Sequence, residues 1–234
     1  YSVIGATTIP HTGTTATIEA PKPDGAQAGD LAVVYLYVSD NAGTKGASGP
    51  VQAEDGWVFM NNDGTPVWDG SAYGRLFAYK VLDSSDDEES SFTFTFAGTT
   101  DISDGNGAGG RVYVYRGIYP GATVVSAGDD AYSSTGTSHT ARAVITPTYW
   151  ALVIVVAKAV NDSTTVNAPA GFTEDYNSGG RYSASKIQAT AGSTGTLSFT
   201  TGSDSLLSAT IAVSLIQPAS TGGGGSGGGG GGSP

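Results

Sequence analysis

Histidine is the side chain that most often acts as a general base, and this chain has only two, His11 and His139. A nucleophilic triad needs such a base beside its nucleophile. His11 follows Pro10 at an N-terminal turn and His139 lies in a Ser- and Thr-rich approach to a strand, so we interpret both as solvated loop residues. The chain has no cysteine and no Gly-x-Ser-x-Gly, phosphate-loop or dinucleotide-binding motif. We therefore expect that the protein is not an enzyme.

Carboxylate pairs are the other candidates for catalysis, because a glycosidase needs only two carboxyl groups held at a fixed separation. Glu54 with Asp55 and Glu174 with Asp175 are the two pairs, and Asp69 is a single candidate. All five residues lie beside predicted turns, and nothing in the surrounding sequence indicates burial. We interpret them as solvated loop residues.

Two oxygen-rich segments could bind a hard cation such as Ca²⁺. The acidic loop 83–89 holds five of the 21 Asp and Glu residues, and a second segment contains Asp101, Asp104 and Asn106. The second segment loosely resembles the opening of an EF-hand loop, without its bidentate Glu or flanking helices. We interpret both segments as hydrated turns and expect no cofactor. The alternative is that one of them binds Ca²⁺. In the second half of the chain, the segment that corresponds to the acidic loop is 189–195, and it has no acidic residue. Replacing the acids of the loop should therefore leave the fold intact.

Aromatic and amide side chains gather in one insertion of the first half, where they could bind a sugar. Trp68 and Tyr73 lie close to Asn61, Asn62 and Asp69 along the chain, and the second half has no counterpart. Exposed aromatic faces pack against the C–H surfaces of sugars, and amides bind their hydroxyl groups. The alternative is an ordinary Trp that packs within its own loop.

The elements that position these residues are predicted to be β-strands. Phenylalanines alternate with Ser and Thr over 91–96, and continuous apolar runs at 31–38 and 150–156 are typical of buried strands. Trp57 and Phe172 each precede a predicted strand and are expected in the core. Because Gly and Thr, which are poor helix formers, recur throughout, we expect an all-β antiparallel protein with almost no helix.

The predicted strands occur twice in the same order, so the chain is interpreted as two pseudo-repeated halves of seven strands, 1–118 and 119–217. The matched segments are 2–6 with 124–128, 14–18 with 140–144, 31–38 with 152–159, 56–57 with 171–172, 74–80 with 180–186, 92–94 with 197–199 and 111–115 with 210–214. We expect one double-layer β-sandwich of jelly-roll or Greek-key type over 1–217, with two abutting sandwiches as the alternative.

The chain ends in a glycine-rich tail, 218–234, which we interpret as a flexible linker or as a segment held by a neighbouring subunit.

The net charge of −11 makes nucleic acid an unexpected partner, because like charges repel and no Lys or Arg cluster makes a local exception. The longest apolar run has 8 residues, from Trp150 to Ala157, so no membrane insertion is expected.

Several short motifs of the first half resemble a recurrent module of bacteriophage structural proteins, found in minor tail, tail-fibre and head-decoration components and in secreted bacterial surface proteins. The motifs are Ala28-Gly29-Asp30-Leu31, Asp55-Gly56-Trp57, Phe77-Ala78-Tyr79-Lys80-Val81, Ser91-Phe92-Thr93-Phe94 and Val114-Tyr115-Arg116-Gly117. The second half repeats the pattern more weakly, so that the resemblance covers about residues 1–217. It implies a scaffold and no catalytic residue.

The resemblance leads us to expect a non-enzymatic virion structural protein on the virion surface, which assembles with other virion subunits or with copies of itself and attaches to a host surface. The alternative is an extracellular adhesin or filament subunit of a bacterium or archaeon, with a surface glycan as its ligand at Trp68. A polysaccharide hydrolase is a third and weaker hypothesis.

Overall fold

The computed structural model describes residues 1–12, 17–39, 50–68, 73–96, 108–129, 131–133, 136–147, 149–161, 163–202 and 204–215. The expectation of an all-β antiparallel protein is confirmed, since the only helices in these ranges are two short 3₁₀ segments, η1 at 62–64 and η2 at 86–88. No helix in the described ranges is both long and apolar enough to span a bilayer.

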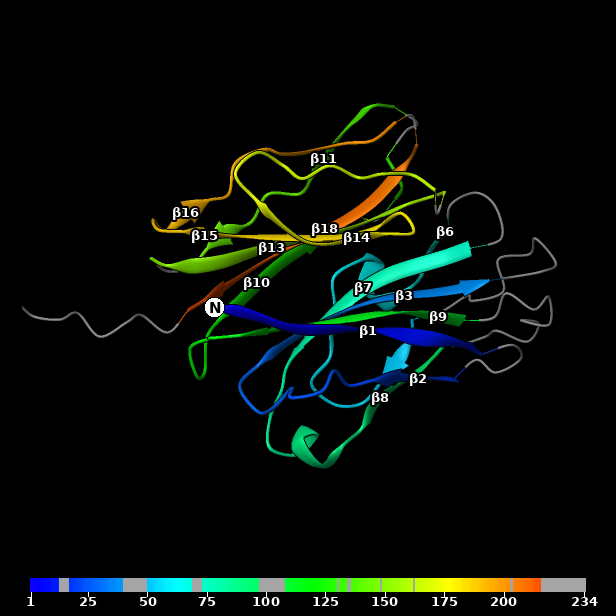
Figure 1. The fold of residues 1–234 in the computed structure, drawn as a ribbon, viewed down its shortest axis with the longest axis vertical. Helices are drawn as coiled ribbons and strands as arrows, with labels where there is room; N and C mark the ends of the chain where they lie inside the picture. The colour runs from blue at the N-terminus through cyan, green and yellow to red at the C-terminus, as the bar shows by residue number, and fades with distance from the viewer. Residues whose placement is uncertain are drawn as a thin grey trace, which may run out of the picture.

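The first half of the chain forms a large and a small antiparallel sheet (Figure 1). The large sheet has the order β1 (Ser2–Thr12), β9 (Ala108–Arg116), β3 (Leu31–Ser39), β7 (Tyr73–Val81) and β5 (Val58–Phe59), and β6 (Val67–Trp68) also pairs with β7. The small sheet has the order β2 (Thr17–Pro21), β8 (Ser91–Thr95) and β4 (Gln52–Ala53).

The second half forms a further large sheet and two strand pairs. The large sheet has the order β10 (Val124–Gly128), β18 (Leu206–Ser214), β13 (Ala151–Ala159), β15 (Arg181–Gln188) and β14 (Thr173–Ser178). The two pairs are β11 (Ser138–Ala141) with β17 (Leu197–Thr200), and β12 (Ile145–Thr146) with β16 (Gly192–Ser193).

The two large sheets are apolar on both faces, because side chains alternate between the faces of a strand and the central strands are apolar throughout. Val34 and Leu36 of β3 pack with Phe92 and Phe94 of the small sheet in a first core. Leu31, Val33 and Tyr35 lie on the other face of β3. With side chains of β7 and β9 they pack against β13 and β18 in a second core that both halves share. A third core lies between β13, β15 and the pair β11 and β17.

The described sheets therefore stack in four layers, with the two large sheets in the middle, where the sequence analysis expected a double layer (Figure 1). The reason is that a strand with apolar side chains on both faces needs cover on both faces. Trp57 is buried between Phe92 and Phe94 as expected. The expected start of a buried strand at Trp150 is wrong: β13 begins at Ala151, and Trp150 is 47% exposed.

Candidate functional site

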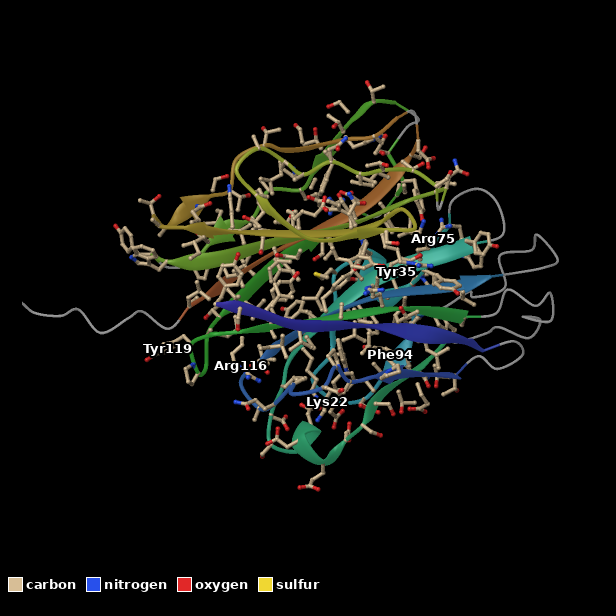
Figure 2. All side chains as sticks on the ribbon, in the orientation of Figure 1. Lys22, Tyr35, Arg75, Phe94, Arg116 and Tyr119 are labelled. Atoms are coloured by element: carbon tan, nitrogen blue, oxygen red, sulfur yellow. The ribbon has the colours of Figure 1, made fainter. Side chains whose placement is uncertain are left out.

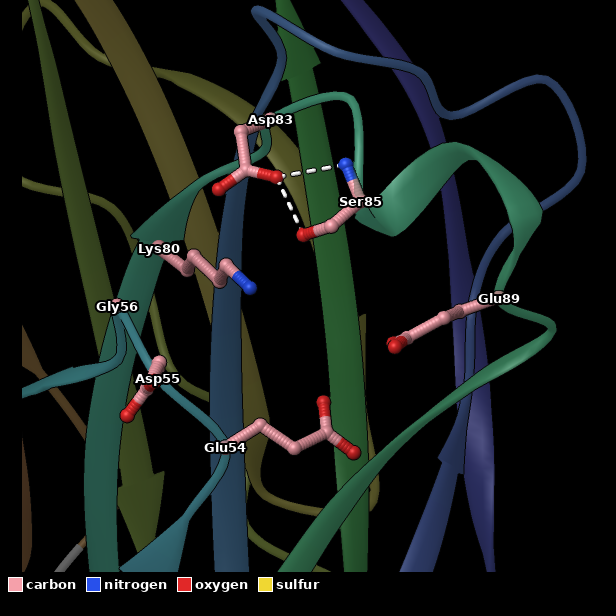
Figure 3. Close-up of a pocket in the computed structure, with 7 residues that line it drawn as sticks. All are labelled: Glu54, Asp55, Gly56, Lys80, Asp83, Ser85 and Glu89. Carbon is pink, nitrogen blue, oxygen red and sulfur yellow. Dashed lines mark hydrogen bonds between the residues drawn. The ribbon is translucent and has the colours of Figure 1, made fainter.

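A pocket of about 280 Å³ opens between a turn at 54–56, strand β7 and the acidic loop 83–89 (Figure 3). Its lining combines four carboxylates with one ammonium group and one hydroxyl. The lining residues are Glu54, Asp55, Gly56, Lys80, Asp83, Ser85 and Glu89.

The turn at 54–56 supplies two of the carboxylates that line the pocket. Gly56 has a φ of +89°, a conformation that glycine adopts without steric cost, and a Cβ here would lie 3.1 Å from Cε of Lys80. One oxygen of Glu54, Oε1, accepts a hydrogen bond of 2.7 Å from the backbone N–H of Thr93 in β8. The turn is thus anchored to β8 of the small sheet.

A buried ion pair closes the inner side of the pocket. The Nζ atom of Lys80 lies 2.6 Å from Oδ1 of Asp86, and both side chains are almost completely buried. The other oxygen of Asp86, Oδ2, accepts a hydrogen bond of 2.8 Å from the backbone N–H of Asp83. The geometry argues against the interpretation of the acidic loop as dispensable, because Asp86 neutralises a buried lysine and organises the loop.

The carboxylates of the pocket differ in their electrostatic surroundings. Hydrogen bonds from the hydroxyl and the backbone N–H of Ser85 lower the pKa of Asp83. Partial desolvation, followed by repulsion from Glu54 and Asp86, raises the pKa of Glu89. Since the charge of Lys80 is already balanced by Asp86, the pocket as a whole attracts positive charge.

The pocket can accept hydrogen bonds from a cationic group such as an ammonium or a guanidinium. Oε2 of Glu54 is buried and finds no hydrogen-bond donor among the described residues. Within the same part of the chain, no three acidic or histidine side chains come together in a group that could hold a metal ion. The sequence offered one signal for this site, since Lys80 lies between the apolar run 76–79 and Val81 and needs a nearby acid.

The residues predicted to form a sugar platform serve separate packing roles. Asn61 is fully buried, where its side chain accepts a hydrogen bond of 2.7 Å from Phe77 N–H and donates one of 2.8 Å to the carbonyl of Asp129. Trp68 is half-buried and packs against the first core, with its ring over Gly74. The ring of Tyr73 lies 5.1 Å from the guanidinium of Arg75.

Some predicted site residues lie outside the described part of the chain. These are Asp69 of the sugar platform and Asp101, Asp104 and Asn106 of the second calcium segment. The side chains of Asn62 and His11 are likewise outside the description, although their backbones are within it.

His139 is buried, so its interpretation as a solvated loop residue is wrong. Its Nδ1 lies 2.6 Å from Oγ of Ser133, and its Nε2 lies 3.0 Å from the carbonyl oxygen of Gly136. Because a carbonyl can only accept, Nε2 donates to Gly136, and the neutral imidazole accepts at Nδ1 from the serine hydroxyl. Oγ of Ser133 in turn accepts a hydrogen bond of 2.9 Å from Leu206 N–H, so the pair fastens a loop to the start of β18. The alternation of strand β11 was the signal in the sequence, since it places His139 on the same face as the buried Ala141.

Asp175 was interpreted as a solvated residue, but the structure places it where the two halves meet. Its carboxylate accepts hydrogen bonds of 3.2 Å from the hydroxyl of Tyr115 in β9 and of 3.0 Å from that of Ser185 in β15. Burial raises the pKa of Asp175 above that of an ordinary aspartate. Glu174, the other member of this candidate carboxylate pair, is exposed and accepts a hydrogen bond from the side chain of Asn177.

No protein-family model, no curated protein and no solved structure matches this chain.

Proposed function

We propose that this chain is a non-enzymatic structural subunit of an extracellular assembly, such as the tail, tail fibre or head decoration of a bacteriophage, which works through protein–protein contacts. One observation carries the proposal: among the described residues, Arg75, Lys80 and His139 together with Asp86 and Asp175 are engaged in holding strands and sheets together. The resemblance of the first-half motifs to phage structural modules agrees with this role.

Arg75 illustrates how such a side chain joins the two halves. It is buried at 4% exposure, donates a hydrogen bond of 2.6 Å to the hydroxyl of Tyr132, and lies over the rings of Tyr73 and Tyr132 (Figure 2). Lys80 pairs with Asp86 inside the first half, His139 holds a loop within the second, and Asp175 binds Tyr115 across the junction. A reactive group held in this way supports rigidity, which a structural subunit requires.

The same proposal includes an internal repeat, with residues 1–118 and 119–217 as two copies of one seven-strand unit followed by the tail 218–234. The orders of the two large sheets support it. In each half the first strand pairs with the last, as β1 with β9 and β10 with β18, and the last strand then pairs with the central β3 or β13. A duplicated scaffold of this kind presents two similar surfaces to its neighbours.

Two measurements on the full chain test the proposed function. Sedimentation and negative-stain electron microscopy over about 1 to 200 µM should show oligomers of defined copy number, as expected for an assembly subunit in the micromolar affinity range. Assays for reducing sugars released from a panel of polysaccharides should stay at the level of the buffer control. A monomer at every concentration contradicts the assembly role, and release of sugar contradicts the non-enzymatic role.

A further inference from the structure

Exposed apolar side chains are concentrated at one end of the molecule. Among the described residues, eight large hydrophobic side chains are exposed, and all except Val58 lie at the end where the N-terminus and the last residues of β18 are found. Figure 1 marks the N-terminus at this end, and Figure 2 shows Tyr119 there. We name this surface the apolar end, and it consists of Tyr1, Val3, Tyr119, Ile145, Tyr149, Trp150 and Ile187.

Backbone hydrogen bonds around the end of β18 bring the central members together. Tyr119 N–H donates a bond of 3.0 Å to the carbonyl of Ser214, and Leu215 N–H donates one of 3.1 Å to the carbonyl of Trp150. Tyr119 and Trp150 therefore flank the end of this strand on opposite sides. Tyr149, 65% exposed, directly precedes Trp150.

The remaining members join the same end through neighbouring strands. The hydroxyl of Tyr1 lies 3.0 Å from Oγ of Ser185, and Ile187, two residues further along β15, points to the same face of the strand. Gln188 pairs with Ala151 and donates a hydrogen bond of 3.2 Å to the hydroxyl of Thr146, which follows Ile145.

The backbone conformation of Trp150 supports a binding role for the apolar end, in addition to its part in the fold. Trp150 has a φ of +58°, in the left-handed region that a bulky residue rarely adopts. Such strained positions persist only when the surrounding structure enforces them, and they cluster at functional sites. Here the strained residue is a tryptophan of the apolar end that is 47% exposed.

The distribution of charge identifies what can approach this surface. The chain carries a net charge of −11, yet the segments that supply the apolar end, 1–18, 117–128, 143–161 and 176–203, contain no Asp or Glu. Two copies of an acidic protein repel one another wherever their carboxylates face. The Asp175 carboxylate, which Ser185 connects to the hydroxyl of Tyr1, is partly buried and accepts hydrogen bonds from Tyr115 and Ser185. Two copies that meet at the apolar end therefore experience less of that repulsion, and both remove apolar area from water.

We propose that the apolar end is the surface on which a second copy of this chain docks, with the same residues contributed by both copies. This inference rests on the proposed assembly function and names its partner. A two-fold axis through one self-complementary patch is the commonest arrangement in homo-oligomers, and a core rich in Tyr and Trp and poor in charge is typical of such interfaces. Trp150 and Tyr119 are the central contacts of the dimer.

The test compares the dimerisation of full-length variants by sedimentation equilibrium. Trp150→Asn removes the indole and retains a residue that tolerates a positive φ, and Tyr149→Ser combined with Ile187→Thr removes two flanking side chains. Each should weaken the dimer by at least about tenfold, as for truncation of a central interface residue. Val58→Thr, the matched control, alters the one large exposed hydrophobic side chain that the described residues place outside the apolar end, and it should leave the dimer unchanged. Far-UV circular dichroism and thermal melting confirm the fold of every variant.

A second measurement needs no variant. Because the segments that supply the apolar end contain no Asp or Glu, raising NaCl from about 0.05 to 0.5 M should leave the dimer as strong or make it stronger, since salt screens the repulsion between the acidic bodies. A dimer that weakens with salt, or apolar-end variants that dimerise like the unaltered chain, would overturn the inference while the assembly function stands. A chain that is monomeric throughout would overturn both, and release of sugar from a polysaccharide would contradict only the non-enzymatic role.

Discussion

The ion pair between Lys80 and Asp86 joins strand β7 to the acidic loop. Asp86→Ala leaves the ammonium of Lys80 buried without a counter-charge, and removing one partner of a buried pair costs about 3 to 5 kcal/mol. For a protein of this size the melting temperature should fall by roughly 10 °C. Thermal denaturation followed by circular dichroism measures the change.

Two further variants separate the ion pair from the loop in general. Glu88→Ala alters an exposed acid of the same loop and should change the stability by less than about 0.5 kcal/mol. Replacing both partners, with Lys80→Met and Asp86→Leu, removes the buried charges together and should recover much of the loss. Equal melting temperatures for Asp86→Ala and Glu88→Ala would show that the pair does not stabilise the fold.

The carboxyl group of Asp175 should make stability depend on pH in a defined direction. Burial raises its pKa in the folded protein, so the folded state binds its proton more tightly than the unfolded state does. This contribution to stability is complete below the ordinary aspartate pKa and is lost as the pH rises through the folded-state value. Asp175→Asn, whose amide can still bond to Tyr115 and Ser185, removes the titration. The variant should therefore gain stability relative to the unaltered chain as the pH rises from about 3 to 7, the range in which carboxyl groups titrate.

Melting temperatures of both proteins across this range provide the measurement. The difference between variant and unaltered chain is the informative quantity, because it cancels the titration of the other acidic residues. A difference that shrinks or reverses towards neutral pH would contradict the role assigned to the burial of Asp175.

At the level of the strand, β9 depends on a glycine that no other residue can replace. Gly110 pairs with Leu36 of β3 on one side and with Ile9 of β1 on the other. A Cβ at this position would lie 1.9 Å from the carbonyl oxygen of Tyr35, a backbone atom that cannot move without separating the strands. Gly110→Ala should cost at least about 4 kcal/mol, in the range of exceptional single substitutions, or prevent folding.

Gly202→Ala is the matched control for this substitution. A Cβ at Gly202 meets no atom within 4 Å, and its φ is not in the left-handed region, so its stability should change by less than about 0.5 kcal/mol. The soluble yield and the melting temperature of the two variants are compared directly. A Gly110→Ala protein as stable as Gly202→Ala would mean that β9 and β3 are not paired in this register.

The strands themselves were predictable because the signal for a strand is local. Alternation over 92–96 and the apolar run at 31–38 correspond to β8 and β3, and Trp57 occupies the core position that its place before a strand indicated. The burial of a polar residue is harder to predict when its hydrogen-bond partner is distant in the sequence. Asn61 bonds to a carbonyl 68 residues away, and Asp175 to a hydroxyl 60 residues away, so only the packing of the halves shows either contact.

The number of layers also depends on contacts between distant segments. A continuous apolar run indicates that a strand is covered on both faces, but it does not indicate which segment of the chain covers each face. In the structure, one face of β3 is covered by β8 of its own half and the other face by strands of the second half. The shared core therefore makes each half a part of the other's interior.

The shared core predicts that the two halves unfold together. Ile154 of β13 lies in this core with Tyr35 of β3, and Ile154→Ala should cost about 2 to 5 kcal/mol because it leaves a cavity. Trp57 and Trp68 belong to the first half, so in a Trp150→Phe background the tryptophan fluorescence reports on the first half alone. In that background, Ile154→Ala in the second half should lower the denaturation midpoint of the first-half fluorescence and that of the circular dichroism by the same amount. A circular dichroism transition that moves while the fluorescence transition stays in place would mean that the halves are independent domains and that the core between them contributes little.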